Sequence, residues 1–107
     1  MKKELSFYPS LYIGKSIKPK KVDKIKRKLA KKPLLCSQFL ITIASNPKDQ
    51  LDIFSARQLV QSYYDKYPPY IIGIAADYDE AVEIVELIVK ECYLNRGDYS
   101  LREFLLC

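Results

Sequence analysis

Carboxylates are the side chains of this sequence with the clearest chemical potential. Asp77, Asp79 and Glu80 stand together directly after an apolar run, and Asp52 lies within another such run. Carboxylate oxygens suit Mg²⁺, which needs few direct protein ligands, so a magnesium-dependent hydrolase is one hypothesis. Acids at the start of a helix are also expected as caps and as partners of the helix dipole. We favour this structural role, with no metal ion.

The three cysteines, Cys36, Cys92 and Cys107, form no recognisable motif. No two of them stand at a CxxC or metal-ligand spacing, and the sequence has no histidine to activate a thiolate or bind zinc. The phosphate-loop, dinucleotide and nucleophile-elbow motifs are missing too. We therefore expect a chain that is not an enzyme and has no cofactor. Unpaired cysteines in odd number fit a reducing cytoplasm.

Four tyrosines surround the pair Pro68-Pro69: Tyr63, Tyr64, Tyr67 and Tyr70. Exposed tyrosines are common at protein interfaces, because the ring adds contact area and the hydroxyl adds a hydrogen bond. The cluster predicts an interface. Our leading hypothesis is a non-catalytic binding or protein-interaction domain of unknown ligand that self-associates, with a protein partner or a second copy bound.

The net charge of +5 conceals a division of the chain into two parts. Residues 1–32 contain twelve Lys/Arg against two acids, a net of +10. Residues 33–107 contain six Lys/Arg against eleven acids, a net of −5. A solvated helix face accounts for the basic part, and an anionic partner is the alternative.

The segment Leu11-Tyr12-Ile13-Gly14-Lys15-Ser16 resembles the first-strand motif of RNA-recognition-motif domains. The resemblance implies that Tyr12 stacks on a base, with Phe54 of a later strand as its neighbour. Residues 51–56 depart from that family's third-strand motif, which is rich in glycine and aromatic residues. The alternative function is single-stranded nucleic-acid binding through the basic N-terminal third, with these residues: Tyr12, Lys20, Lys21, Lys24, Arg27, Lys28, Lys31 and Phe54.

Hydrophobic periodicity and turn residues predict the elements that position these side chains. In chain order we expect an irregular lead-in over residues 1–10, a strand over 11–14 and a helix over 19–32. Strands over 38–45 and 51–54, joined by a turn at 46–50, should follow, and then a helix of about ten to twelve residues after Ser55 that ends at Pro68. The last elements should be a strand over 70–75, a helix over 78–95 and a short helical turn over 101–106.

This order predicts an α+β fold in one domain that spans residues 1–107. We expect an α/β sandwich with a ferredoxin-like β-α-β-β-α-β sheet of four strands and an additional C-terminal helix. A small three-layer α/β sandwich is the alternative. The additional helix should cover the second face of the sheet or pair with another copy of the chain.

Strand alternation predicts which residues share a face of the sheet. The buried face should carry Leu11, Ile13, Ile41, Ile43, Leu51 and Ile53, and the opposite face should carry Tyr12, Thr42, Phe54 and Gly73. No apolar run reaches the roughly 18 residues of a membrane span, and no apolar segment follows the basic N-terminus as export requires. The sequence therefore predicts a cytoplasmic protein with no membrane span.

Overall fold

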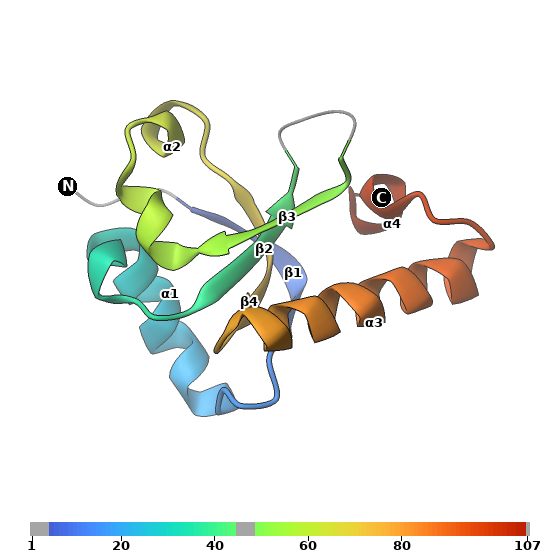
Figure 1. The fold of residues 1–107 in the computed structure, drawn as a ribbon, viewed down its shortest axis with the longest axis horizontal. Helices are drawn as coiled ribbons and strands as arrows, with labels where there is room; N and C mark the ends of the chain where they lie inside the picture. The colour runs from blue at the N-terminus through green and yellow to red at the C-terminus, as the bar shows by residue number, and fades with distance from the viewer. Residues whose placement is uncertain (1–4, 45–48, 107) are drawn as a thin grey trace.

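The computed structural model describes residues 5–44 and 49–106 (Figure 1). These residues form four strands and four α-helices, together with three short 3-10 helices (η). In chain order the elements are β1 (Ser6–Ile13), η1 (Pro19–Lys21), α1 (Val22–Lys31), η2 (Pro33–Leu35), β2 (Phe39–Ile43), β3 (Leu51–Ser55), η3 (Ala56–Val60), α2 (Tyr63–Lys66), β4 (Tyr70–Ala75), α3 (Tyr78–Arg96) and α4 (Leu101–Leu106). Residues 46–48 of the predicted turn lie outside the described residues.

The four strands form one mixed sheet in the order β1-β4-β2-β3. β1 runs parallel to β4, and β2 is antiparallel to both β4 and β3. The predicted hairpin of β2 and β3 is confirmed, because Ile41 pairs with Ile53. The α+β class is confirmed as well. The ferredoxin-like topology is not confirmed, because β1 lies at an edge of the sheet instead of at its centre.

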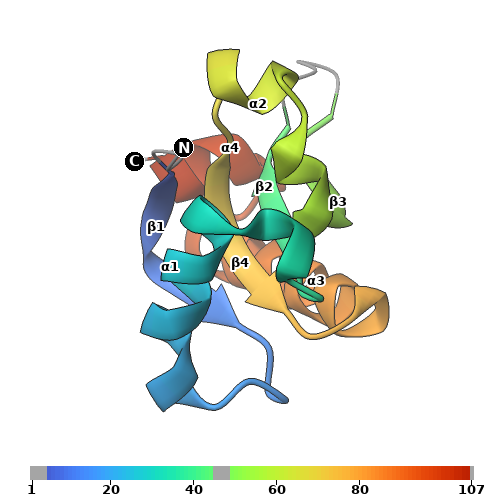
Figure 2. The ribbon, with the colours of Figure 1, turned by 90° about the vertical axis from the view of Figure 1, so that its left-hand side faces the viewer.

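Helices cover both faces of the sheet, so the domain has three layers. Figure 2 shows α1 in front of the sheet and α3 behind it. One hydrophobic cluster joins the sheet to α1 and η3, and a second joins it to α3 and α4. We call these two faces the α1 face and the α3 face. α3, the additional helix of the prediction, therefore covers the second face of the sheet. This was one of the two arrangements expected for it.

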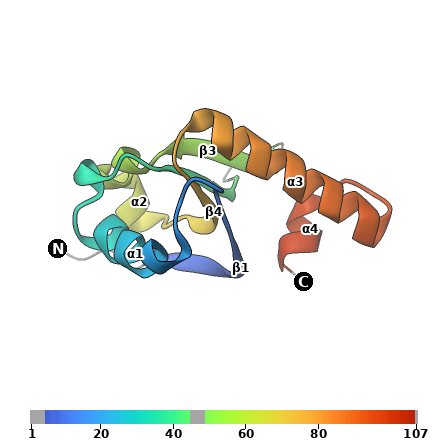
Figure 3. The ribbon, with the colours of Figure 1, turned by 90° about the horizontal axis from the view of Figure 1, so that it is seen from below.

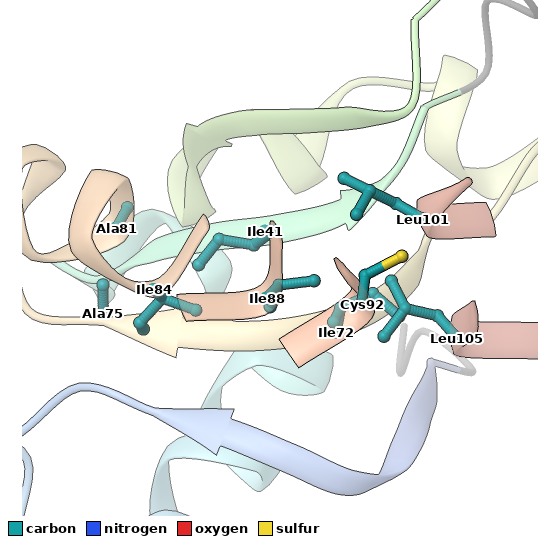
Figure 4. Packing of buried hydrophobic residues seen from close by; sticks show 9 residues of the cluster. All are labelled: Ile41, Ile72, Ala75, Ala81, Ile84, Ile88, Cys92, Leu101 and Leu105. Atoms are coloured by element: carbon teal, nitrogen blue, oxygen red, sulfur yellow. The ribbon is translucent and has the colours of Figure 1, made fainter. Parts of the chain in front are cut away.

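The core of the α3 face extends beyond the sheet. Ile84, Ile88 and Cys92 of α3 point toward Ile41 and Ile72 of the sheet (Figure 4). Farther along, α3 runs past the edge of the sheet and α4 packs beside it (Figure 3), adding Leu101 and Leu105 to the same cluster. Gly97 ends α3 with a φ of 78°, a left-handed conformation that glycine adopts at little cost and that reverses the chain.

The predicted division of strand residues between the faces was wrong for β1 and for Gly73 of β4, which faces Ile41 and Ile84 on the α3 face. Leu11 and Ile13 pack on the α1 face together with Phe54, whereas Tyr12 packs on the α3 face with Ile41. The cause is the pairing register: Tyr12 lies opposite Gly73, and Gly73 lies opposite Ile41. Alternation fixes the two sides of one strand, but only the register decides which sides of neighbouring strands coincide.

Two predicted elements differ from the structure by more than a few residues at their ends. β1 begins at Ser6, so residues 6–10 are not irregular. Pro9 is accommodated there because β1 is an edge strand whose register shifts between Phe7 and Tyr12. The single helix expected after Ser55 is two short ones, η3 and α2, because Gln61 between them has an extended backbone.

Candidate functional site

A cavity of about 240 Å³ lies between α2 and the neighbouring ends of β2, β3 and β4. We call it the tyrosine pocket. Its walls are mainly aromatic and proline side chains, with one carboxylate and one threonine. They are formed by Thr42, Ile43, Asp52, Phe54, Tyr63, Tyr64, Tyr67, Pro68, Pro69 and Tyr70. The four tyrosines predicted as a cluster therefore surround one cavity.

The aromatic walls of the tyrosine pocket pack against one another. Tyr63 meets Tyr64 edge-on, with ring centroids 5.1 Å apart, and meets Tyr67 at 5.2 Å with a tilt of 41°. Phe54 stacks on Tyr64 at 5.3 Å. Such pairs lie within the usual separation of favourable ring contacts, so the walls hold their arrangement without a ligand.

Asp52 is the only formally charged side chain among the residues that line the pocket. Within residues 5–44 and 49–106, no hydrogen-bond donor or cationic group is paired with its carboxylate. Burial, together with the neighbouring Tyr63 and the negative charge of Asp52, raises the pKa of Tyr64. Tyr64 is therefore a neutral phenol at physiological pH, and the pocket carries one negative charge.

The lining residues provide aromatic contact area and one carboxylate, an arrangement that suits binding. A carboxylate surrounded by neutral phenols lacks the paired nucleophile and base that acyl or phosphoryl transfer needs. The cavity is also smaller than the roughly 300–1,000 Å³ of pockets that enclose drug-sized molecules. It fits a side chain or a small head group.

The two aromatic residues of the nucleic-acid hypothesis do not form one platform. The Tyr12 hydroxyl donates a hydrogen bond of 2.6 Å to Glu91 of α3, so this ring lies between the sheet and that helix. Burial and this hydrogen bond raise the pKa of Tyr12 above its usual range. Phe54 lies on the opposite face of the sheet, in the wall of the tyrosine pocket.

The basic residues of that hypothesis do share a surface. Lys24, Arg27, Lys28 and Lys31 are exposed and recur at the spacing of one side of α1. Lys20 and Lys21 are exposed in η1, directly before that helix. We call these six residues the basic strip.

The carboxylates of the magnesium hypothesis do not come together. Asp77 caps α3, since its carboxylate accepts a hydrogen bond of 2.8 Å from the backbone N–H of Glu80. Asp52 lies on β3, in the tyrosine pocket. Among the described residues, no group of three or more His, Cys, Asp or Glu side chains could hold a metal ion.

Glu80 has a structural role that the sequence did not reveal. Its carboxylate accepts hydrogen bonds from the backbone N–H groups of Ser16, at 3.1 Å, and Ala76, at 2.9 Å. Partial desolvation opposes ionisation, but these hydrogen bonds hold the pKa of Glu80 below its ordinary value. The carboxyl ends of adjacent parallel strands are a common ligand site in α/β sheets. Here, at the ends of β1 and β4, Glu80 fills that position itself.

The described cysteines are poorly placed as nucleophiles. Cys36 and Cys92 are free thiols with buried side chains. Burial raises the pKa of both, which keeps them protonated and weakly reactive. Cys107 lies outside the described residues.

The sequence reasoning found the tyrosines of the candidate site but missed its remaining walls. Asp52 and Phe54 were each assigned to a different hypothesis, and Thr42 to none. Their alternation along β3 places Asp52 and Phe54 on one face, and this was the signal that could have joined them.

Among the described residues, none of the helices combines the length and the hydropathy that a membrane span requires. Comparisons with protein-family models, with curated proteins and with solved structures found no match to this chain.

Proposed function

We propose that this chain is a non-catalytic binding domain whose ligand site is the tyrosine pocket. The observation that carries this proposal is a preformed cavity of about 240 Å³ with aromatic walls and a single carboxylate. Its chemistry is that of recognition, because aromatic rings supply contact area and the carboxylate supplies polarity. The lack of histidine and the buried thiols support the non-catalytic part.

Two of the pocket's rings are unusually open to solvent. Tyr63 is 46% exposed and Tyr67 is 57% exposed, although both pack against other rings. Large exposed aromatic side chains beside a pocket are typical of residues that contribute most to binding. A ligand in the pocket would cover them.

Amide NMR spectra of the labelled chain test this proposal. A panel of neutral, cationic and anionic fragments should shift signals of β3 and α2 and leave those of α3 unchanged. Tyr67→Ser should weaken the binding of any fragment found. Tyr99→Ser is the matched control, because Tyr99 is also 57% exposed but does not line the pocket. A panel in which no fragment shifts the pocket signals would contradict the proposal.

Self-association is the second part of the proposal, and charge supports it. The basic strip lies on the outer side of η1 and α1. The outer side of α3 carries exposed Glu86, and Glu83 paired with Lys15 at 3.4 Å, beside Leu87 and Leu94, which are 45% and 71% exposed. Opposite charges on opposite faces favour a head-to-tail contact between two copies, with α3 of one against α1 of the next.

Light scattering after size-exclusion chromatography measures this association. We expect a mass above that of the monomer at low salt, a decrease toward the monomer at high salt, and a weaker association for Leu94→Ser. A monomer at high protein concentration and low salt would remove self-association from the proposed function. That result would not contradict the proposal that the tyrosine pocket is a ligand site.

Nucleic-acid binding is the second candidate function, and the basic strip favours it. Six exposed cations on one surface suit contact with phosphates, without the aromatic stacking of the original hypothesis. Fluorescence anisotropy with single-stranded RNA should then show binding that weakens steeply with salt. The triple variant Lys24→Glu, Arg27→Glu, Lys28→Glu should abolish it, and Lys90→Glu on α3 should not. Lack of binding at low salt would exclude this candidate.

A further inference from the structure

We infer that the tyrosine pocket binds an organic cation, specifically a methylated ammonium group. This inference rests on the proposed function and adds the chemical class of the ligand. Aromatic rings attract cations through the negative potential of their faces, over distances of up to about 6 Å from the ring centroid. Cages of aromatic side chains are a recurrent solution for quaternary ammonium groups.

The orientation of the rings supports a cage. Tyr63 is nearly perpendicular to Tyr64, with an interplanar angle of 88°, and is tilted by 41° from Tyr67. Because these rings lie in different planes, aromatic side chains bound the pocket from more than one direction. Phe54 stacks on Tyr64, which attaches this part of the wall to β3.

Asp52 decides the sign of the ligand's charge. Its carboxylate lies in the same cavity and has no hydrogen-bond or ion-pair partner among the described residues. A neutral ligand that covered it would remove water from an unpaired charge, which is costly. An anionic ligand would add repulsion. A cation compensates the carboxylate and contacts the aromatic faces at the same time.

The composition of the walls decides the kind of cation. Magnesium and calcium ions prefer carboxylate and carbonyl oxygens, and Asp52 is the only carboxylate side chain of these walls, whose other side-chain oxygens are hydroxyls. An unmodified ammonium is strongly hydrated and would lose that water among the rings. Methylation replaces its N–H groups with apolar surface that matches aromatic walls. The volume of about 240 Å³ suits such a head group and not a whole nucleotide or peptide.

NMR titration of the full chain with defined probes tests the inference. The probes are choline, its neutral carbon isostere 3,3-dimethylbutanol, and the amides of N-acetyl-trimethyllysine and N-acetyl-lysine. We expect choline to bind about tenfold more tightly than the isostere, and trimethyllysine about tenfold more tightly than lysine. Affinity for trimethyllysine well above that for choline would identify a peptide as the carrier of the group. Equal affinities would identify the free head group as sufficient.

Variants connect the binding to the pocket. Asp52→Asn keeps the side-chain shape, removes the charge and should weaken choline binding about fivefold or more. Glu86→Gln makes the same change in charge on exposed α3 and should have no effect. Tyr67→Leu removes an exposed ring and should also weaken binding, which provides a second test if Asp52→Asn unfolds.

The outcomes separate this inference from the function on which it rests. Equal binding of choline and its neutral isostere would overturn the cation inference and leave the pocket as a ligand site. Unchanged choline affinity in folded Asp52→Asn would have the same meaning. If neither these probes nor the fragment panel shifted the pocket signals, both the inference and the proposed function would be overturned.

Discussion

Gly14 and Glu80 show how a single pair of residues holds the ends of β1 and β4 together. A Cβ atom at position 14 would overlap the Glu80 carboxylate, so only glycine leaves room for it. That carboxylate in turn accepts hydrogen bonds from backbone N–H groups on both sides of the junction. Hydrogen bonds to charged groups contribute more than neutral ones. The short segment after β1 therefore depends on a helix that follows it by more than sixty residues in the chain.

Gly14→Ala should lower the free energy of unfolding by about 2–4 kcal/mol, because the added methyl group displaces Glu80 from two backbone donors. Urea unfolding followed by circular dichroism measures this change. Gly97→Ala is the comparison, since a Cβ atom there meets nothing within 4 Å and only the left-handed φ is strained. We expect it to cost about 1 kcal/mol. Equal costs for the two variants would contradict the proposed role of Glu80.

Glu80→Gln should destabilise the chain at neutral pH by about 1–3 kcal/mol, because a neutral amide is a weaker acceptor. The effect depends on pH. The pKa of Glu80 is lowered in the folded state, so its stabilisation is fully present above the unfolded-state pKa of about 4.3 and is lost as pH falls through the folded-state value. The difference between wild type and variant should therefore narrow below about pH 4 in urea titrations. A constant difference down to pH 2 would exclude this explanation.

Among the elements, α3 determines which side chains on its side of the molecule are covered and which are exposed to solvent. It covers one face of the sheet, places Glu91 against the Tyr12 hydroxyl and directs Leu87 and Leu94 outward. The same helix therefore removes an aromatic side chain from solvent on its inner side and supplies apolar surface on its outer side. Tyr12 of β1 is therefore a residue that packs against α3.

A double-mutant cycle with Tyr12→Phe and Glu91→Gln measures the contact between β1 and α3. We expect a coupling energy of about 1 kcal/mol in unfolding experiments, because the hydrogen bond joins a partly buried phenol to a carboxylate. Tyr12→Phe should leave any RNA binding unchanged. Additive effects of the two substitutions would show that this hydrogen bond contributes no stability.

On the scale of the whole molecule, one sheet serves two cores. Leu40 and Ile41 are neighbours in β2 and both are fully buried, but Leu40 belongs to the cluster of the α1 face and Ile41 to that of the α3 face. Every residue that packs on either face therefore depends on the same strands. The two cores should unfold together.

Leu40→Ala and Ile41→Ala should each lower the free energy of unfolding by about 2–5 kcal/mol, because each leaves a cavity in a close-packed core. Each should shift a single transition, with coincident curves from circular dichroism and tyrosine fluorescence. A variant in which the two probes separate would show that the two faces unfold independently.

The candidate site could be predicted only in part. Tyr63, Tyr64, Tyr67 and Tyr70 stand close in sequence, so their clustering was visible from the order of residues. Asp52 reaches them from another strand, and only the position of α2 against the sheet brings them together. The break at Gln61 was not apparent either, because a 3-10 helix and an α-helix share similar short-range sequence patterns.

Local sequence specified the strand over 39–43 with its hairpin partner β3, the strand over 70–75, the cap at Asp77 and the stop at Gly97, because each depends on neighbours within a few residues. The strand order, the face on which Tyr12 lies and the closing of the β1–β4 junction by Glu80 depend on contacts between distant segments. Such contacts are set by the register of paired strands and by how helices share the faces of the sheet, and periodicity within one segment carries no information about either.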